Sequence, residues 1–178
     1  MNLVCLTMLA HDQPRTVAPP TIRPTPPLYS SAMTTLARAI AIAAQAHEGQ
    51  VDKAGDPYIL HPLRMMFSLE SEDEKIAAIL HDVVEDTPWT FKQLRGEGFE
   101  EAVLTALKHL TKRRGEDYMG FVKRAARNPI ARRVKIADLE DNMCLTRMGV
   151  VRAKDLKRVE RYHRAWTYLR GLPDDAGR

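Results

Sequence analysis

The sequence predicts an all-α fold, and three observations lead to this expectation. Aliphatic residues dominate the 44% hydrophobic fraction, because aromatic residues make up only 6% of the 178 positions. Apolar residues recur at the three-to-four-residue spacing of a helix, most clearly over 76–84. No stretch alternates between apolar and polar residues as a half-buried strand would. A chain of this length is expected to form one domain with a sizeable core.

The first predicted helices are bounded by turn and capping residues. An Ala-rich helix is expected over 34–48, followed by a turn over 53–57. Proline is tolerated at the first helical position, so Pro62 predicts the start of a second helix that runs to about Leu69. This placement puts His61 at the N-cap of that helix.

A capping box starts the next predicted helix. Ser71 and Glu74 have the spacing at which each side chain bonds the other residue's backbone amide. The helix is expected over 72–85, and Thr87-Pro88 ends it. Five further helices are predicted near 90–96, 100–111, 116–127, from Asn128-Pro129 to about Met148, and from about Ala153 to Arg170. The sequence therefore predicts a bundle of about seven to nine helices.

The two ends of the chain differ from this central part. Six of the eleven prolines fall between Pro14 and Pro27, which predicts a Pro-rich disordered tail over 1–31. The folded domain is expected over 32–172, with a flexible C-terminus over 173–178. Met33 is an alternative translation start, in which case the preceding residues would not be native.

Charge is segregated along the chain, whose net charge is +4. Ten acids and three bases fall within 68–101, whereas ten bases and two acids fall within 108–135. The first segment suits cations and the second suits phosphate oxygens. A small phosphorylated ligand fits this pattern better than nucleic acid, because there is no helix-turn-helix signature and few aromatic residues are available for stacking.

No apolar run approaches the roughly 20 residues of a membrane span, so no membrane partner is expected. Residues 1–10 are apolar, but they lack the basic segment and cleavage pattern of a signal peptide. Cys5 and Cys144 form no CxxC pair, and a reducing cytoplasm is the expected location. Cys144 is expected to be a small core residue.

Several polar residues stand where the helical period predicts core residues. His81 and Asp82 lie within an apolar stretch, and Asp138 and Asn142 lie on the apolar stripe of the helix that starts at Pro129. Burying such groups is costly unless a metal, a cation or several donors pair with them. A divalent metal is one such partner. The alternative is a structural hydrogen bond within a His-Asp pair.

With His61, these residues offer two imidazoles and two carboxylates. A set composed of His61, His81, Asp82 and Asp138 suits Mn²⁺, Fe²⁺, Co²⁺ or Zn²⁺. A metal of this kind lowers the pKa of bound water and so supports hydrolysis. Glu85 and Asp86, one helical turn further on, are candidates to orient or deprotonate the water. In the alternative interpretation His61 is only a helix cap, and the two acids lie on a solvated helix end.

The order of these segments resembles the hydrolase domain of RelA/SpoT-type alarmone enzymes, a branch of the HD-domain metal phosphohydrolases. The resemblance runs from about Ala43 to Met148, and the H-D-V-V-E-D-T block is its most specific part. We find no sign of a synthetase domain, so a small stand-alone hydrolase is expected. The matching pieces, in chain order, are Ala46–Gln50, Lys53–Pro62, Leu80–Thr87, Leu110–Lys112 and Val134–Met143.

The resemblance implies an HD-domain helical bundle that holds one Mn²⁺, with other divalent metals possible. It implies hydrolysis of the 3′-pyrophosphate of guanosine tetra- or pentaphosphate. Glu85 and Asp86 match the residues that serve the attacking water. Asn142 matches a nucleotide contact, Lys53 matches a residue that lies beside the base and phosphates, and Lys112 matches a phosphate contact.

Three positions depart from the family pattern. Asp52 stands where the family has an arginine that packs against the base, and it cannot replace that stacking surface. Leu139 and Asp141 stand in place of an arginine and a histidine, so part of the base-recognition shell is expected to be lost. The substrate therefore stays open between a guanine alarmone, an adenine alarmone, a broader pyrophosphorylated nucleotide and the 2′-phosphate of NADPH.

Two further interpretations are weighed against an alarmone hydrolase. A general HD nucleotide phosphohydrolase would use the same metal ligands with a different base site. A non-catalytic nucleotide-binding regulator would be expected to lose ligands, and none is missing from this sequence. The oligomeric state stays open.

Overall fold

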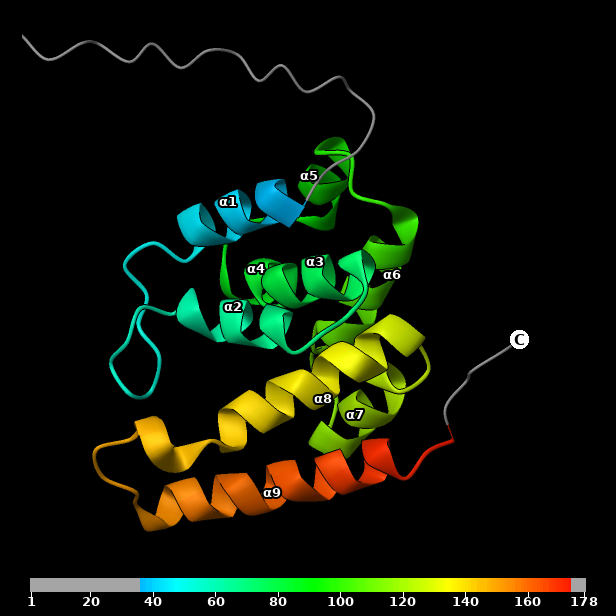
Figure 1. Cartoon of the computed structure of the whole chain (residues 1–178). Coiled ribbons are helices and arrows are strands. Elements are labelled where there is room, and N and C mark those ends of the chain that lie inside the picture. Colours follow the sequence, from blue (N-terminus) through cyan, green and yellow to red (C-terminus); the bar gives the residue numbers. More distant parts are fainter. Residues whose placement is uncertain (1–35, 174–178) are drawn as a thin grey trace, which may run out of the picture. The chain divides into compact units, whose positions relative to one another are not determined.

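A computed structural model describes residues 36–173, which lie within one compact unit and are almost entirely helical (Figure 1). This confirms the predicted all-α class. Within the described range the one β-type pairing is an isolated bridge between Val51 and Pro57. The expected tail over 1–31, the alternative start at Met33 and residues 174–178 lie outside the described residues.

Nine α-helices and one 3-10 turn make up this range. In chain order they are α1 (Leu36–Ala46), α2 (Leu60–Phe67), α3 (Glu72–Leu80), α4 (Val83–Asp86), α5 (Phe91–Gly96), α6 (Glu101–Leu110), α7 (Tyr118–Ala125), α8 (Pro129–Met143), η1 (Leu145–Arg147) and α9 (Ala153–Arg170). None of these helices is long and apolar enough to cross a membrane.

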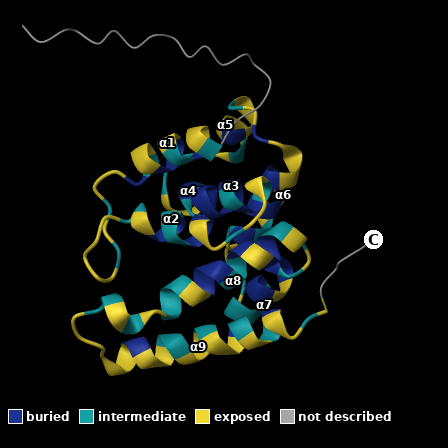
Figure 2. Cartoon of the chain, viewed as in Figure 1, coloured by how far each residue is buried: buried dark blue, intermediate teal, exposed yellow. Residues whose placement is uncertain are grey.

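Helix α3 is the centre of the main core. It packs against α1, α2, α6 and α8, and Figure 2 shows it as largely buried. The predicted capping box is present, with Ser71 and Glu74 each bonding the other's backbone amide. Ala77 and Ala78 are completely buried, and their small side chains let the neighbouring helices approach closely. Complete burial of Ile79 stabilises the fold by about 1.5–3 kcal/mol.

Helix α8 lies between two cores. Val134 faces the main core around α3, whereas Leu139 packs with Val122 and Leu169 in a second, smaller core. Helix α9 lies along α8 and runs in the opposite direction (Figure 1). The end of α8 and the start of α9 therefore lie on the same side of the domain. The buried guanidinium of Arg132 fixes the far end of α9 by donating to the carbonyls of Leu169, Leu172 and Pro173.

Three predicted helix boundaries are wrong. The N-cap of α2 is Ile59 and not His61, because the preceding turn is already helical: the His61 amide bonds the Tyr58 carbonyl. The predicted helix over 72–85 is interrupted at His81 and Asp82. The imidazole Nδ1 of His81 bonds the Ala78 carbonyl, which a continuous helix would use for the Asp82 amide.

The third wrong boundary is the end of α8, which stops at Met143 and not at Met148. The carbonyl of Asp141 accepts from the Cys144 amide and from Nη2 of Arg147. These bonds take the place of the one that a continuing α-helix would make to this carbonyl, and the chain turns into η1. As a result Asp141 and Asn142, in the last turn of α8, lie beside the loop that leads to α9.

Candidate metal centre

A cavity of about 380 Å³ opens where the loop after α1, the start of α2, the end of α8 and the start of α9 meet. Four sequence-predicted site residues from three parts of the fold line it together: His61 on α2, Asp82 between α3 and α4, and Asp138 and Asn142 on α8. The wall also carries Asp52 and Lys53 from the loop. Their contact with a substrate stays a prediction.

His61 is buried in the first turn of α2, with both ring nitrogens facing carboxylates. Its Nδ1 lies 2.7 Å from Oδ2 of Asp141, and its Nε2 lies 3.3 Å from Oδ1 of Asp138. Burial opposes protonation of the ring, but the hydrogen bonds that Asp138 and Asp141 accept from it outweigh this effect and raise the pKa of His61 to about 9. The surroundings of this ring therefore favour positive charge.

His81 is buried at the end of α3, and its Nδ1 lies 2.8 Å from the Ala78 carbonyl. A carbonyl only accepts, so Nδ1 must carry a proton. In the neutral ring the lone pair is then on Nε2, which lies 2.8 Å from Oδ2 of Asp82 and 4.0 Å from Oδ1 of Asp138. A histidine whose Nδ1 is fixed by a backbone carbonyl has the arrangement common among metal-binding histidines.

Asp138 is buried on the inward face of α8, where the sequence predicts it. Its Oδ2 lies 2.6 Å from Nζ of Lys135, and its Oδ1 lies 2.6 Å from Nδ2 of Asn142. Burial raises the pKa of this carboxyl, but attraction to Lys135 and to both histidines outweighs it and holds the pKa below its usual range. Asp138 is therefore an ionised oxygen donor at the base of the cavity.

This donor set fits a divalent metal. One ligand atom from each of His61, His81 and Asp138 can be chosen so that all lie within 4.8 Å of one another. Two imidazole nitrogens and a carboxylate oxygen suit divalent first-row transition metals. Asp82 adjoins this cluster through His81 and accepts a hydrogen bond from the Tyr58 hydroxyl. Its role as a fourth ligand stays a prediction.

The two acids predicted to serve the attacking water lie on the short helix α4. Glu85 and Asp86 are exposed and do not line the cavity. Partial loss of solvent around the Asp86 carboxyl, together with the charges of Asp82 and Glu85, raises the pKa of Asp86, which is suited to a proton acceptor. Glu85 accepts from the backbone amide of Lys112 at 2.8 Å. The side chain of Lys112 is exposed and is not part of the cavity wall, so its phosphate contact stays a prediction.

The structure changes the interpretation of two departures from the family pattern. Leu139 is buried in the second core and does not line the cavity. Asp141 does line the cavity, but its carboxylate is bound to His61, Arg64 and Arg147. Asp141 therefore contacts the metal cluster through His61, which the sequence alone did not predict.

Sequence reasoning also missed several residues of the cavity wall. Arg64, Arg147 and Arg158 line it, and only the basic character of 153–170 pointed to the last of these. Cys144, expected in the core, is exposed and also lines the cavity.

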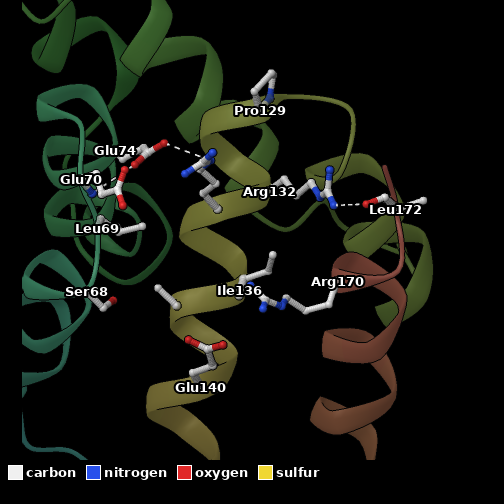
Figure 3. Close-up of a pocket in the computed structure, with 12 residues that line it drawn as sticks. Ser68, Leu69, Glu70, Glu74, Pro129, Arg132, Ile136, Glu140, Arg170 and Leu172 are labelled. Atoms are coloured by element: carbon white, nitrogen blue, oxygen red, sulfur yellow. Dashed lines mark hydrogen bonds and ion pairs between the residues drawn. The ribbon is translucent and has the colours of Figure 1, made fainter. Parts of the chain in front are cut away.

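A second cavity, of about 540 Å³, lies between the α2–α3 loop, α8 and the end of α9 (Figure 3). Its lining contains no histidine. Its three arginines already have partners: Arg132 donates to Leu172, Arg133 lies 3.4 Å from Glu74, and the Arg170 guanidinium lies over the Trp166 ring. This cavity therefore lacks the donor set of a transition-metal site.

Replacing Asp141 with alanine is expected to weaken metal binding about 10- to 100-fold, because His61 loses the carboxylate that fixes its ring. Calorimetric titration of the metal-free protein with Mn²⁺ would measure this. Glu140→Ala is the matched control, since the neighbouring Glu140 carboxylate accepts from Trp166 and not from the cluster. Equal affinities for both variants would contradict the positioning role of Asp141.

The sequence pattern of the HD domain family matches residues 39–164, and the chain belongs to this family. Family membership and the His/Asp cluster together indicate a divalent-metal site.

Among curated proteins the chain is similar to bacterial alarmone enzymes. It is 36% identical over 116 residues to a guanosine-3′,5′-bis(diphosphate) 3′-pyrophosphohydrolase of Haemophilus influenzae, covering 57% of this chain and 17% of that protein. It is 32% identical over 140 residues to the bifunctional (p)ppGpp synthase/hydrolase SpoT of Escherichia coli, covering 71% and 20%. The chain spans about a fifth of the length of these relatives.

Among solved structures the chain is similar to a metazoan ortholog of SpoT that is described as hydrolysing ppGpp. The TM-score is 0.62, the sequence identity is 21%, and the match covers 80% of this chain and 89% of that structure. At this identity the likeness supports the helical fold.

Proposed function

We propose that this chain is a Mn²⁺-dependent hydrolase that removes the 3′-pyrophosphate of alarmone nucleotides. The observation that carries the proposal is the buried cluster of His61, His81 and Asp138, which adjoins a cavity lined by both acidic and basic side chains. Similarity to curated 3′-pyrophosphohydrolases supports the choice of reaction.

The metal would be held by His61, His81, Asp82 and Asp138. When bound, a divalent ion supplies Lewis acidity and lowers the pKa of coordinated water. Lys135 and Asn142 keep the Asp138 carboxylate ionised and oriented.

The reaction requires a base, phosphate contacts and a proton donor. Water would attack the phosphorus bonded to ribose O3′, the O3′–P bond would break with O3′ as the leaving group, and the proton taken from the water would be returned to O3′ as pyrophosphate is released. We assign the removal of the water proton to Asp86, with Glu85 holding the adjacent loop through Lys112. Lys53 and Arg158, which share the cavity wall, are placed to neutralise the phosphates.

A substrate panel tests this proposal. Purified protein with Mn²⁺ is incubated with guanosine and adenosine 3′-pyrophosphorylated nucleotides and with NADPH, and the products are separated by ion-exchange chromatography. We expect pyrophosphate release from at least one 3′-pyrophosphorylated nucleotide, and loss of this release in Asp82→Ala. A panel that stays uncleaved would overturn the proposal. Release of phosphate from NADPH alone would favour the general phosphohydrolase instead.

A further inference from the structure

Arg64 has an unusual position in the wall of the metal cavity. It lies on α2, three residues after His61, and its guanidinium group faces two carboxylates. Nε is 2.7 Å from Oδ1 of Asp141, and Nη2 is 3.1 Å from Oδ2 of the same residue. Nη2 also lies 3.8 Å from Oδ2 of Asp52. One edge of the guanidinium is therefore held by Asp141, with Asp52 close by.

This arrangement fixes the plane of the group, so that its faces and its Nη1 edge are left to contact a ligand. The Arg64 side chain is 30% exposed and lines the cavity. Its charge is countered by the two carboxylates, so it is a weaker phosphate ligand than Lys53 in the same wall. A guanidinium fixed at its edge is pre-organised to stack on an aromatic ring, because little conformational entropy remains to be lost.

The location fits a base that is joined to a phosphate at the metal. Asp141 contacts both His61 and Arg64, so the guanidinium is one side chain away from the metal cluster. A nucleotide with its phosphate at the cluster would extend its sugar and base along this wall.

We infer that Arg64, held by Asp141 and Asp52, is a specificity-determining residue that stacks on the nucleobase of the substrate. This inference rests on the proposed function, and it names the group that would recognise the base at that site. It also gives Asp52 a role: its Oδ1 accepts the amides of Ala54 and Asp56, which fixes the loop so that Oδ2 faces Arg64.

The test compares two ligands that differ only in the base, guanosine 5′-monophosphate and ribose 5-phosphate. Dissociation constants are measured by NMR titration of the protein loaded with diamagnetic Zn²⁺, wild type and Arg64→Lys. Lysine keeps the positive charge but lacks the planar guanidinium group. Stacking on one base is worth about 1–3 kcal/mol, so the variant is expected to bind the nucleotide about 5- to 150-fold more weakly. Binding of ribose 5-phosphate is expected to change less than about twofold, because it has no base to stack.

Arg95→Lys is the matched control. Arg95 makes the same two-pronged contact with a carboxylate, that of Glu101, on the exposed surface and outside the cavity. It is expected to leave both dissociation constants unchanged. If Arg64→Lys weakens the binding of both ligands equally, Arg64 contacts the phosphate and not the base. If both dissociation constants are unchanged, Arg64 contacts neither ligand. Either result overturns the inference, as would a wild type that binds the two ligands equally.

These measurements involve no turnover, so they separate the inference from the proposed reaction. A base-dependent loss in Arg64→Lys, found in a protein that cleaves none of the nucleotides in the panel, would support the base site and reject the hydrolase. Cleavage without a base-dependent loss would do the reverse.

Discussion

Asp138→Asn is expected to abolish binding of the divalent metal and to lower kcat by about 1,000-fold or more. Metal ions supply several kcal/mol of transition-state stabilisation, and about 4 kcal/mol corresponds to this factor. Asparagine keeps the shape of the side chain but removes the charge that faces His61 and Lys135. Bound metal is measured by elemental analysis after dialysis, and turnover by release of pyrophosphate.

The matched control for this substitution is Asp117→Asn. Asp117 is exposed and caps α7 by accepting from the Gly120 amide, and asparagine caps helices equally well. Thermal unfolding of both variants shows whether they remain folded. A folded Asp138→Asn protein that keeps one metal per chain and its turnover would exclude Asp138 from the metal site.

Arg124→Met is expected to destabilise the fold by about 3–5 kcal/mol, the usual loss when one partner of a buried ion pair is removed. The buried guanidinium makes a two-pronged contact with Glu116, and it donates to the carbonyls of Lys108, His109 and Thr111. All of these acceptors would lose their partner together. Urea unfolding measures the change, and an unchanged m-value would show that only stability was altered.

Arg95→Met gives the surface counterpart of this variant. Arg95 and Glu101 form a two-pronged contact of the same kind, but their side chains are 52% and 64% exposed. Water replaces the lost contact, so the unfolding midpoint is expected to stay nearly unchanged. Similar destabilisation by both substitutions would contradict the view that burial makes the Arg124 contacts important.

The helices could be predicted from the sequence because their signals are local. The capping box of Ser71 and Glu74 requires only four consecutive residues, and helix α9 occupies 153–170 as its amphipathic pattern predicts. The break at His81 could not be predicted in this way. It depends on an imidazole that bonds the backbone of its own helix, while the residue pattern on both sides continues to favour a helix.

The metal cluster could be predicted in part for a similar reason. Asp138 interrupts an apolar stripe, and a buried carboxylate requires a partner. Asp141 and Arg64 carry no such signal, because they are 77 residues apart and meet only when α2 packs against α8. The family pattern led to the expectation that Asp141 marks a lost contact. The structure connects Asp141 to His61 and Arg64, and so to both the metal and the base sites that we propose.

The central claim is that the His/Asp cluster is the metal centre of a 3′-pyrophosphohydrolase. The most direct test is to strip the protein with a chelator, add Mn²⁺ back in steps, and follow bound metal and pyrophosphate release from guanosine tetraphosphate together. We expect both to rise in parallel and to saturate at one ion per chain. Full activity in the stripped protein, or saturation with metal without any pyrophosphate release, would contradict the claim.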